Sequence, residues 1–196
     1  MPYIDPGRHY CNAPSSSTTP CAQADAIVAT ARKWIGTRFT HQGRVRATDT
    51  HRGGCDCLGL IIGVAQELNL TTTRGDTCVL LASCDRRDYG HNPERYVLEE
   101  ALCTWLERIP AAVMAPGDVA LFCLESTPQH VGIVSDYRIQ DTASAHRQHT
   151  HCPYPSGHRN LGLIHAYAQA RKTVEHHFND WWRARLVGAF RFAATQ

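Results

Sequence analysis

The segment that most constrains the fold begins at Cys57 and reads CLGLIIGVAQEL up to Leu68. Nearly every position in it is apolar or small, which is typical of a helix that is buried on all sides. Asp56 stands directly before this segment, and aspartate is a favoured residue at the position that caps a helix N-terminus. The sequence therefore predicts a central buried helix whose first turn carries the Cys57 thiol.

A thiol in the first turn of a helix lies near unpaired backbone N–H groups and the positive end of the helix dipole. Both favour an anion, so we expect the pKa of Cys57 to lie below the reference value of about 8.5. Cys55 precedes it by two residues. The local sequence leaves four interpretations of Cys57 open: a metal ligand, a disulfide partner, an inert core thiol or a nucleophile.

The segments before Pro110 have helical patterns, and the segments after it have strand patterns. Two further helices are expected, one from about Pro20 to Gly36 and one over PERYVLEEALCTWLERI, residues 93–109. After Pro110, five short runs of β-branched and aromatic residues, separated by turn residues, predict antiparallel strands. These runs cover residues 116–125, 129–136, 161–168, 172–178 and 186–193. Helices first and strands later are typical of an α+β domain.

The 196 residues are enough for one domain. We divide the chain into an N-terminal arm, residues 1–21, which is rich in Pro, Ser and Thr, and a single domain, residues 22–196. A long polar insertion at about 137–160 separates the second and third predicted strands. It carries His146, His149, His151, Cys152 and His158. A solvated loop and a structural metal site both remain open for it.

The composition argues against several classes of protein. Charged residues make up 19% of the chain, the net charge is +2 and the arginines are scattered, so no nucleic-acid partner is expected. No apolar stretch approaches the ~18 residues of a membrane span. The N-terminus lacks a basic head followed by an apolar core, so we expect synthesis without a Sec signal. The nine cysteines are then expected to be mostly reduced.

Two histidines are candidates to act with the thiol. A nucleophilic cysteine needs a base, usually a histidine, and a third group that orients the base. His130 begins the second predicted strand and His165 lies inside the third. If these strands pair antiparallel, both side chains can point to one face and form a Cys–His–His set with Cys57. Taken singly, each of the three is more often a structural residue.

Five motifs follow one another in an order that resembles one protein family. They read ARKWIGTRFTHQG, GCDCLGL, PGDVALF, HVGIV and LIHAY. The order resembles that of NlpC-type cysteine peptidases, which are papain-like cell-wall hydrolases. The resemblance runs from about Ala22 to Phe192 and is closest to the subgroup found in phage tails and gene-transfer agents. In that subgroup the thiol motif similarly reads DCLGL, and the chain similarly ends in a GAFRF strand.

The resemblance implies an α+β, papain-like fold, with N-terminal helices packed on an antiparallel sheet of about five strands. It also implies that Cys57 is the nucleophile, His130 the general base and His165 the residue that orients His130. The implied substrate is a peptidoglycan stem peptide, most often cut between D-glutamate and the diamino acid through a thioester. No cofactor or catalytic metal is implied.

Several expectations about the cell also come from the resemblance. The chain would be made in the cytoplasm and would act on the cell wall after delivery by a phage-like tail, a secretion system or lysis. A tail protein, another delivery-system protein or an inhibitor would be its protein partner. No membrane partner is expected.

The sequence departs from the family pattern near the expected oxyanion site. Family members often have Gly-Thr-Pro-Tyr after the first helix, whereas this chain has GTRF, so Phe39 offers no hydroxyl. Backbone N–H groups at the Cys57 helix tip would then stabilise the oxyanion, with His41, Gln42 and Asp56 as further oxyanion or substrate candidates. The missing hydroxyl leaves open a catalytically weak or inactive wall-binding or tail module of the same fold. A papain-like acyltransferase is a third alternative.

Two other features have competing interpretations. Cys55 and Cys57 form a Cys-x-Cys pair, but no second pair stands at zinc-ribbon spacing and no His-Glu-x-x-His occurs, so a zinc hydrolase is not favoured. Trp181, Trp182 and Arg183 either line a groove for a carboxylate-bearing peptide or belong to the core and surface of a short helix.

Overall fold

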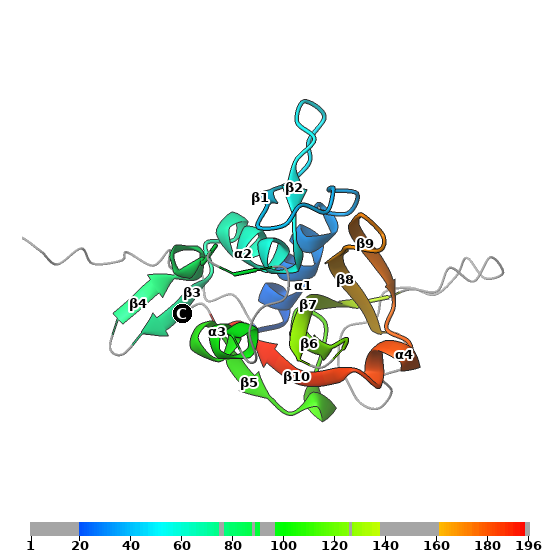
Figure 1. Cartoon of the computed structure of the whole chain (residues 1–196). Helices are drawn as coiled ribbons and strands as arrows, with labels where there is room; N and C mark the ends of the chain where they lie inside the picture. The colour runs from blue at the N-terminus through cyan, green and yellow to red at the C-terminus, as the bar shows by residue number, and fades with distance from the viewer. Residues whose placement is uncertain are drawn as a thin grey trace, which may run out of the picture.

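The computed structural model describes residues 20–74, 77–87, 89, 90, 97–125, 127–137 and 161–194 of the 196-residue chain. These residues form an α+β structure around a six-stranded antiparallel sheet (Figure 1). The predicted arm before residue 20 and nearly all of the His-rich insertion, residues 138–160, lie outside the described residues. The division into an arm and a single domain, and both interpretations of the insertion, therefore stay predictions.

The helices α1 and α2 begin where the sequence predicts them. In the described ranges they are α1 (Pro20–Arg32), α2 (Cys57–Glu67), α3 (Val97–Trp105) and α4 (Asp180–Arg183), with short 3₁₀ turns η1 (Leu81–Cys84) and η2 (Ala111–Val113). Asp56 caps α2 as predicted, because its Oδ1 accepts a hydrogen bond from the backbone N–H of Gly59 at 2.7 Å. None of the helices in this part of the chain is both long and apolar enough to cross a bilayer.

The central sheet has the strand order β5-β10-β6-β7-β8-β9, and every neighbouring pair is antiparallel. Its strands are β5 (Glu107–Ile109), β6 (Val119–Cys123), β7 (Pro128–Asp136), β8 (Leu161–Tyr167), β9 (Lys172–His177) and β10 (Leu186–Arg191). The five strands predicted after Pro110 correspond to β6 through β10 and are confirmed.

The sheet has a sixth strand because the third predicted helix is shorter than expected. The helix predicted over residues 93–109 ends at Trp105 in the structure, and Glu107–Ile109 forms β5 instead. Residues 93–96 lie outside the described residues. Arg108 pairs with Phe190 of β10, so the sheet edge supplies the backbone partners that a continued helix would have supplied. No local pattern in the sequence reveals that edge.

Two small ladders complete the described strands. β1 (Arg44–Val45) pairs with β2 (Gly54–Cys55), directly before the Cys57 helix. β3 (Thr71–Arg74) pairs with β4 (Thr77–Leu80) after it. The sequence predicts neither ladder, because these short segments carry little alternation between apolar and polar side chains.

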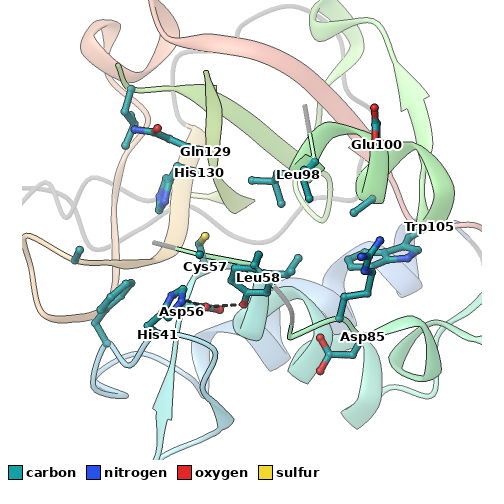
Figure 2. Close-up of a pocket in the computed structure, with 18 of the residues that line it drawn as sticks. His41, Asp56, Cys57, Leu58, Asp85, Leu98, Glu100, Trp105, Gln129 and His130 are labelled. Atoms are coloured by element: carbon teal, nitrogen blue, oxygen red, sulfur yellow. Dashed lines mark hydrogen bonds and ion pairs between the residues drawn. The ribbon is translucent and has the colours of Figure 1, made fainter. Parts of the chain in front are cut away.

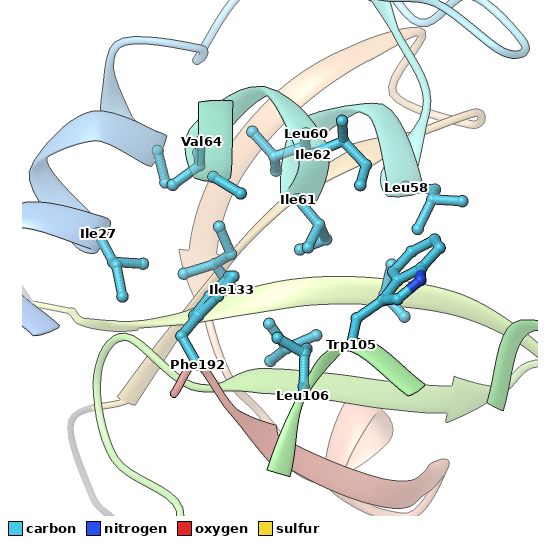
Figure 3. Close-up of a cluster of buried hydrophobic side chains, with 14 of the residues drawn as sticks. Ile27, Leu58, Leu60, Ile61, Ile62, Val64, Trp105, Leu106, Ile133 and Phe192 are labelled. Carbon is cyan, nitrogen blue, oxygen red and sulfur yellow. The ribbon is translucent and has the colours of Figure 1, made fainter. Parts of the chain in front are cut away.

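Side chains alternate between the two faces of the central sheet, and each face has its own core. Leu121 and Ile133 point to the face that α1, α2 and α3 cover, and Figure 3 shows Ile133 below the apolar side of α2. Phe122 and Leu163 point to the opposite face, where they pack with Phe178 and other apolar residues beside α4. The helices and the sheet therefore enclose a core on each side of one layer.

The helix α2 is buried all round, as the apolar run predicts. Leu60 and Ile61 are 0% exposed, and burial of such a side chain contributes about 1.5–3 kcal/mol. A Cβ on Gly59 would lie 2.0 Å from the carbonyl oxygen of Gly43, so only glycine allows that loop to lie against the first turn. This close approach holds the segment before β1 beside Cys57.

Candidate active site

A pocket of about 790 Å³ opens at the N-terminus of α2. Its walls come from segments far apart in the chain: the first turn of α2, the segment from η1 to Gly90, α3, the start of β7 and the residues that end β8. Cys57 and His130 both line this cavity, which we call the Cys57 pocket. Figure 2 shows the Cys57 sulfur pointing toward the His130 ring.

The two predicted histidines are hydrogen-bonded to each other. Nε2 of His130 lies 2.6 Å from Nδ1 of His165. The antiparallel pairing of β7 with β8 places both side chains on one face of the sheet, as the sequence analysis requires. His130 is 6% exposed and His165 is 0% exposed. The structure therefore brings the three predicted catalytic residues into a Cys57–His130–His165 arrangement, with His130 in the middle.

The pKa of the Cys57 thiol differs from the one that its place at a helix N-terminus predicts. Burial and the neighbouring Asp56 carboxylate together raise the pKa of Cys57 to about 12. The backbone N–H groups of Val131, Leu58 and Cys57 act in the opposite direction but do not outweigh burial. The expected lowering of this pKa is therefore wrong for the free protein, because the sequence shows the helix terminus but not the burial.

The base is also uncharged in the free protein. Burial, together with charge repulsion from His176, lowers the pKa of His130 to about 3. At neutral pH the site then holds a thiol and a neutral imidazole rather than a thiolate–imidazolium pair. Attack on a carbonyl requires that the Cys57 proton move to His130 in the same step.

This protonation state predicts how alkylation of Cys57 depends on pH. The rate of Cys57 alkylation by iodoacetamide, read by peptide mapping, should rise continuously between about pH 5 and pH 9, because the reactive thiolate forms only as the pH approaches a raised pKa. A flat rate over the acidic half of that range would instead demonstrate a pre-formed thiolate, and the neutral pair would be wrong.

Asp56 is held by a buried polar network under the pocket. Its Oδ1 accepts from Gly59 and pairs with Nη1 of Arg44 at 3.0 Å, and its Oδ2 accepts from the Tyr89 hydroxyl and the Gln42 backbone N–H, each at 2.7 Å. An ionised carboxylate only accepts hydrogen bonds. Asp56 lines the pocket, but its carboxylate oxygens are already used as acceptors within this network, so its role toward the oxyanion or the substrate stays a prediction.

The network extends to a second carboxylate through Arg44. Its guanidinium also binds Asp85 at 3.0 Å, and the side chains of Arg44, Asp56 and Asp85 are 5%, 4% and 15% exposed. Burial alone lowers the pKa of Arg44, but hydrogen bonds to Asp85 and Tyr89 and the charge of Asp56 leave it raised, so the guanidinium stays charged. These bonds fix the loop before β1 against the first turn of α2.

The remaining predicted site residues divide into two groups. Phe39 and His41 line the Cys57 pocket, and Nδ1 of His41 lies 3.9 Å from Oδ2 of Asp56. Gln42 is not a wall of the pocket; its backbone N–H and its side-chain amide donate to Asp56 and to the Tyr89 carbonyl. His41 therefore remains the side-chain candidate for donating to the oxyanion. Gln42 instead belongs to the hydrogen-bonded network around Asp56, beneath the pocket.

Cys55 lies apart from the pocket despite its closeness in sequence. It is 0% exposed, its Sγ lies 3.3 Å from the Thr173 hydroxyl, and burial raises its pKa to about 11. No group of three or more His, Cys, Asp or Glu side chains in the described ranges is arranged to hold a metal ion.

The tryptophan pair near the C-terminus is also outside the pocket walls. Trp182 is 5% exposed and packs in the core beside the histidines, whereas Trp181 is 45% exposed and lies against the Arg185 guanidinium. These positions match the core-and-surface interpretation of Trp181, Trp182 and Arg183.

Sequence reasoning missed four residues that build the site: Arg44, Asp85, Tyr89 and His176. The first three contact Asp56 or one another across 12 to 45 positions of sequence, and no local pattern signals such pairs. His176 had a weak signal. It shares the alternation of β9 with the half-buried Val174, which lies opposite His165.

Two solved structures share this fold. One is NlpC2 from Trichomonas vaginalis, with a TM-score of 0.51 and 14% sequence identity, covering 87% of this chain and 46% of that chain. The other is an NlpC/P60 family protein from Bacillus cereus, with a TM-score of 0.50 and 16% identity, covering 86% of this chain and 40% of that one. This chain therefore spans less than half the length of either structure.

No protein-family model and no curated protein matches the chain by sequence. At identities of 14% and 16%, the likeness to the two structures concerns the fold alone. The predicted relation to the phage-tail subgroup stays a prediction. What the geometry and the solved structures establish together is that this chain has the papain-like fold of NlpC/P60 proteins.

Proposed function

We propose that the protein is a cysteine peptidase that hydrolyses amide bonds in peptidoglycan stem peptides. The observation that carries this proposal is the Cys57–His130–His165 arrangement at the end of a buried helix, open to the Cys57 pocket. A nucleophile, a base and a group that orients the base are the components of acyl transfer by a thiol. The NlpC-type motifs and the NlpC/P60 fold support peptidoglycan as the substrate class.

The reaction divides into two steps. In the first, Cys57 Sγ attacks the amide carbonyl, its proton passes to His130, and His130 protonates the leaving amine as the C–N bond breaks. In the second, His130 takes a proton from water, the hydroxide attacks the thioester carbon, and the proton returns to Cys57 as the S–C bond breaks. The net change is one water consumed and one amide cleaved.

The first turn of α2 is suited to hold the oxyanion. The backbone N–H groups of Cys57 and Leu58 precede the first intrahelical donors and point toward the thiol. Two such donors stabilise charge that develops on the carbonyl oxygen during attack. His41 lines the same pocket and is the proposed side-chain addition to this pair, in place of the hydroxyl that Phe39 lacks.

The pocket is large enough for several residues of a peptide. Its volume of about 790 Å³ lies in the range of about 300–1,000 Å³ that is common for ligand sites. We propose the bond between D-glutamate and the diamino acid as the one cleaved, on the resemblance of the motifs. We also propose that the protein reaches the wall through a phage-like tail, a secretion system or lysis.

Defined peptides test the activity. The purified protein should convert an L-alanyl-D-γ-glutamyl-diaminopimelyl peptide into two fragments, one of which gains the mass of water. The same reaction with added glycine methyl ester detects an acyltransferase, since the acyl fragment would then carry the amine instead. Binding without any cleavage would favour the inactive wall-binding module.

Chelation separates a thiol mechanism from a metal mechanism. Turnover of the stem peptide should be unchanged after treatment with EDTA, because the proposed nucleophile is a thiolate and not a metal-bound water. Loss of activity that zinc restores would overturn the proposed mechanism. A lower melting temperature with activity retained would indicate a structural metal.

A further inference from the structure

A third histidine extends the hydrogen-bonded pair behind Cys57. Nε2 of His165 lies 2.9 Å from Nε2 of His176 on β9, and Nδ1 of His176 lies 2.9 Å from the backbone carbonyl oxygen of His177. Leu163 lies opposite His176 in the β8–β9 ladder, so His176 projects from the same sheet face as His165. The three rings form a line from the Cys57 pocket to the edge strand of the sheet.

The His177 carbonyl fixes the direction of every hydrogen bond in this line. A carbonyl oxygen only accepts, so Nδ1 of His176 carries the hydrogen and a neutral His176 ring accepts at Nε2. Nε2 of His165 must then donate, which leaves Nδ1 of His165 as an acceptor. Nε2 of His130 must donate to that acceptor, which leaves Nδ1 of His130 without a hydrogen.

Burial makes this assignment rigid. His165 is 0% exposed, so its two ring nitrogens depend on His130 and His176 for hydrogen-bond partners. Trp182 packs against all three imidazoles, with ring centroids 5.6 Å from His130, 4.8 Å from His165 and 5.6 Å from His176. Trp182 is itself 5% exposed, so the rings have little room to turn over.

We propose that His176 is a positioning residue that sets the tautomers of His165 and His130, so that Nδ1 of His130 receives the Cys57 proton. This inference rests on the proposed function. The S–H bond of Cys57 breaks as the S–C bond forms, and the proton moves to Nδ1 of His130. His130 gives it to the amine nitrogen as the C–N bond breaks. His165 and His176 keep their hydrogens throughout.

Loss of the His176 acceptor would permit an unproductive arrangement. Without it, His165 is free to carry its hydrogen on Nδ1 and to donate to His130. His130 then accepts at Nε2 and carries its own hydrogen on Nδ1, the nitrogen to which the proposal assigns the thiol proton. A ring in that form cannot take the Cys57 proton, so turnover falls although the thiol and the base are both present.

The tautomers can be read without any enzymatic assay. Long-range ¹H–¹⁵N NMR of the ¹⁵N-histidine-labelled protein, at a pH of about 8 where ordinary imidazoles are neutral, separates protonated from bare ring nitrogens. We expect hydrogen on Nε2 of His130 and His165 and on Nδ1 of His176. Hydrogen on Nδ1 of His130 would overturn the proposal. This result does not depend on peptidase activity, so it stands apart from any failure of the proposed function.

Two variants of matched length test the effect on turnover. His176→Gln keeps an acceptor near the position of Nε2, whereas His176→Met has a similar shape and no comparable acceptor. We expect His176→Met to lower kcat by about 10–100-fold with KM little changed, in line with other partners that orient a functional histidine. His176→Gln should restore most of kcat.

Control variants distinguish an effect on the orientation of His165 and His130 from a general effect of replacing a histidine. The exposed His51, on the β1–β2 loop, supplies the variant His51→Asn, which removes a histidine outside the line of His130, His165 and His176 and should leave kcat unchanged. Equal kcat for His176→Met and His176→Gln would show that the acceptor has no role. If His176→Met does not fold, the NMR assignments of the native and His176→Gln proteins still decide the proposal.

Discussion

Cys57→Ala and His130→Ala should each lower kcat on a stem peptide by roughly 10³-fold or more, because nucleophile and base act as a unit. Cys57 alone supplies the Sγ atom that forms the thioester. His130 lines the pocket beside it, and in the tautomer inferred above its Nδ1 accepts the proton. Initial rates measured by mass spectrometry over a range of substrate concentrations test this expectation.

His165→Ala should have a smaller effect than His130→Ala, because His165 only orients the base. His165→Asn retains an oxygen that can accept from Nε2 of His130 and should keep more activity than His165→Ala. Full activity of His165→Ala would show that the orienting role is wrong.

The matched control for the thiol is Cys123→Ala. Cys123 ends β6 and is not a wall of the Cys57 pocket, so its loss should leave kcat unchanged. Circular dichroism of every variant should show the native fold. Substantial turnover by Cys57→Ala would contradict the assignment of the nucleophile.

Asp56→Ala should lower the free energy of unfolding by about 3–5 kcal/mol, because it leaves buried donors without their shared acceptor. The substitution removes the cap of α2, which alone contributes about 1 kcal/mol. It also removes the partner of Tyr89 and one of the two carboxylates that compensate the buried Arg44. Urea unfolding followed by fluorescence measures the change.

An exposed ion pair provides the comparison. Asp136 pairs with Arg32, and their side chains are 47% and 38% exposed, so Asp136→Ala should cost no more than about 1 kcal/mol. If Asp56→Ala costs as little as Asp136→Ala, the network does not hold the site together.

Asp56→Asn separates the charge of this residue from its role as a cap. Asparagine still caps a helix, so α2 should begin at the same residue. The negative charge that raises the pKa of Cys57 is gone, and the thiol should be alkylated faster than in the native protein at the same pH. Slower alkylation would contradict this electrostatic effect.

The sequence predicts the helices and strands whose residue patterns lie within one short segment of the chain. The apolar run after Asp56 predicts α2 because a helix without a polar face must be buried, and turn residues between β-branched runs predict β6 through β10. The pairing of β7 with β8 then follows from their order, and it brings His130 and His165 together.

The parts that the sequence does not predict depend on contacts between distant segments. β5 becomes a strand only because the edge of β10 is available to Arg108 and its neighbours. Arg44 and Tyr89 meet at Asp56 only after the loops have folded over α2. The raised pKa of Cys57 likewise depends on burial by the whole fold, whereas the helix terminus, which acts in the opposite direction, is visible in the sequence.

Digestion of whole peptidoglycan tests the central claim most directly. Purified cell walls are incubated with the native protein or with Cys57→Ala, the glycan is then cut to muropeptides, and their masses are compared. The account predicts stem peptides shortened by one amide cleavage, with a new carboxylate on D-glutamate and a new amine on the diamino acid, and none of these in the Cys57→Ala digest. Stem peptides that stay intact, or that are cleaved equally by the Cys57→Ala variant, would contradict it.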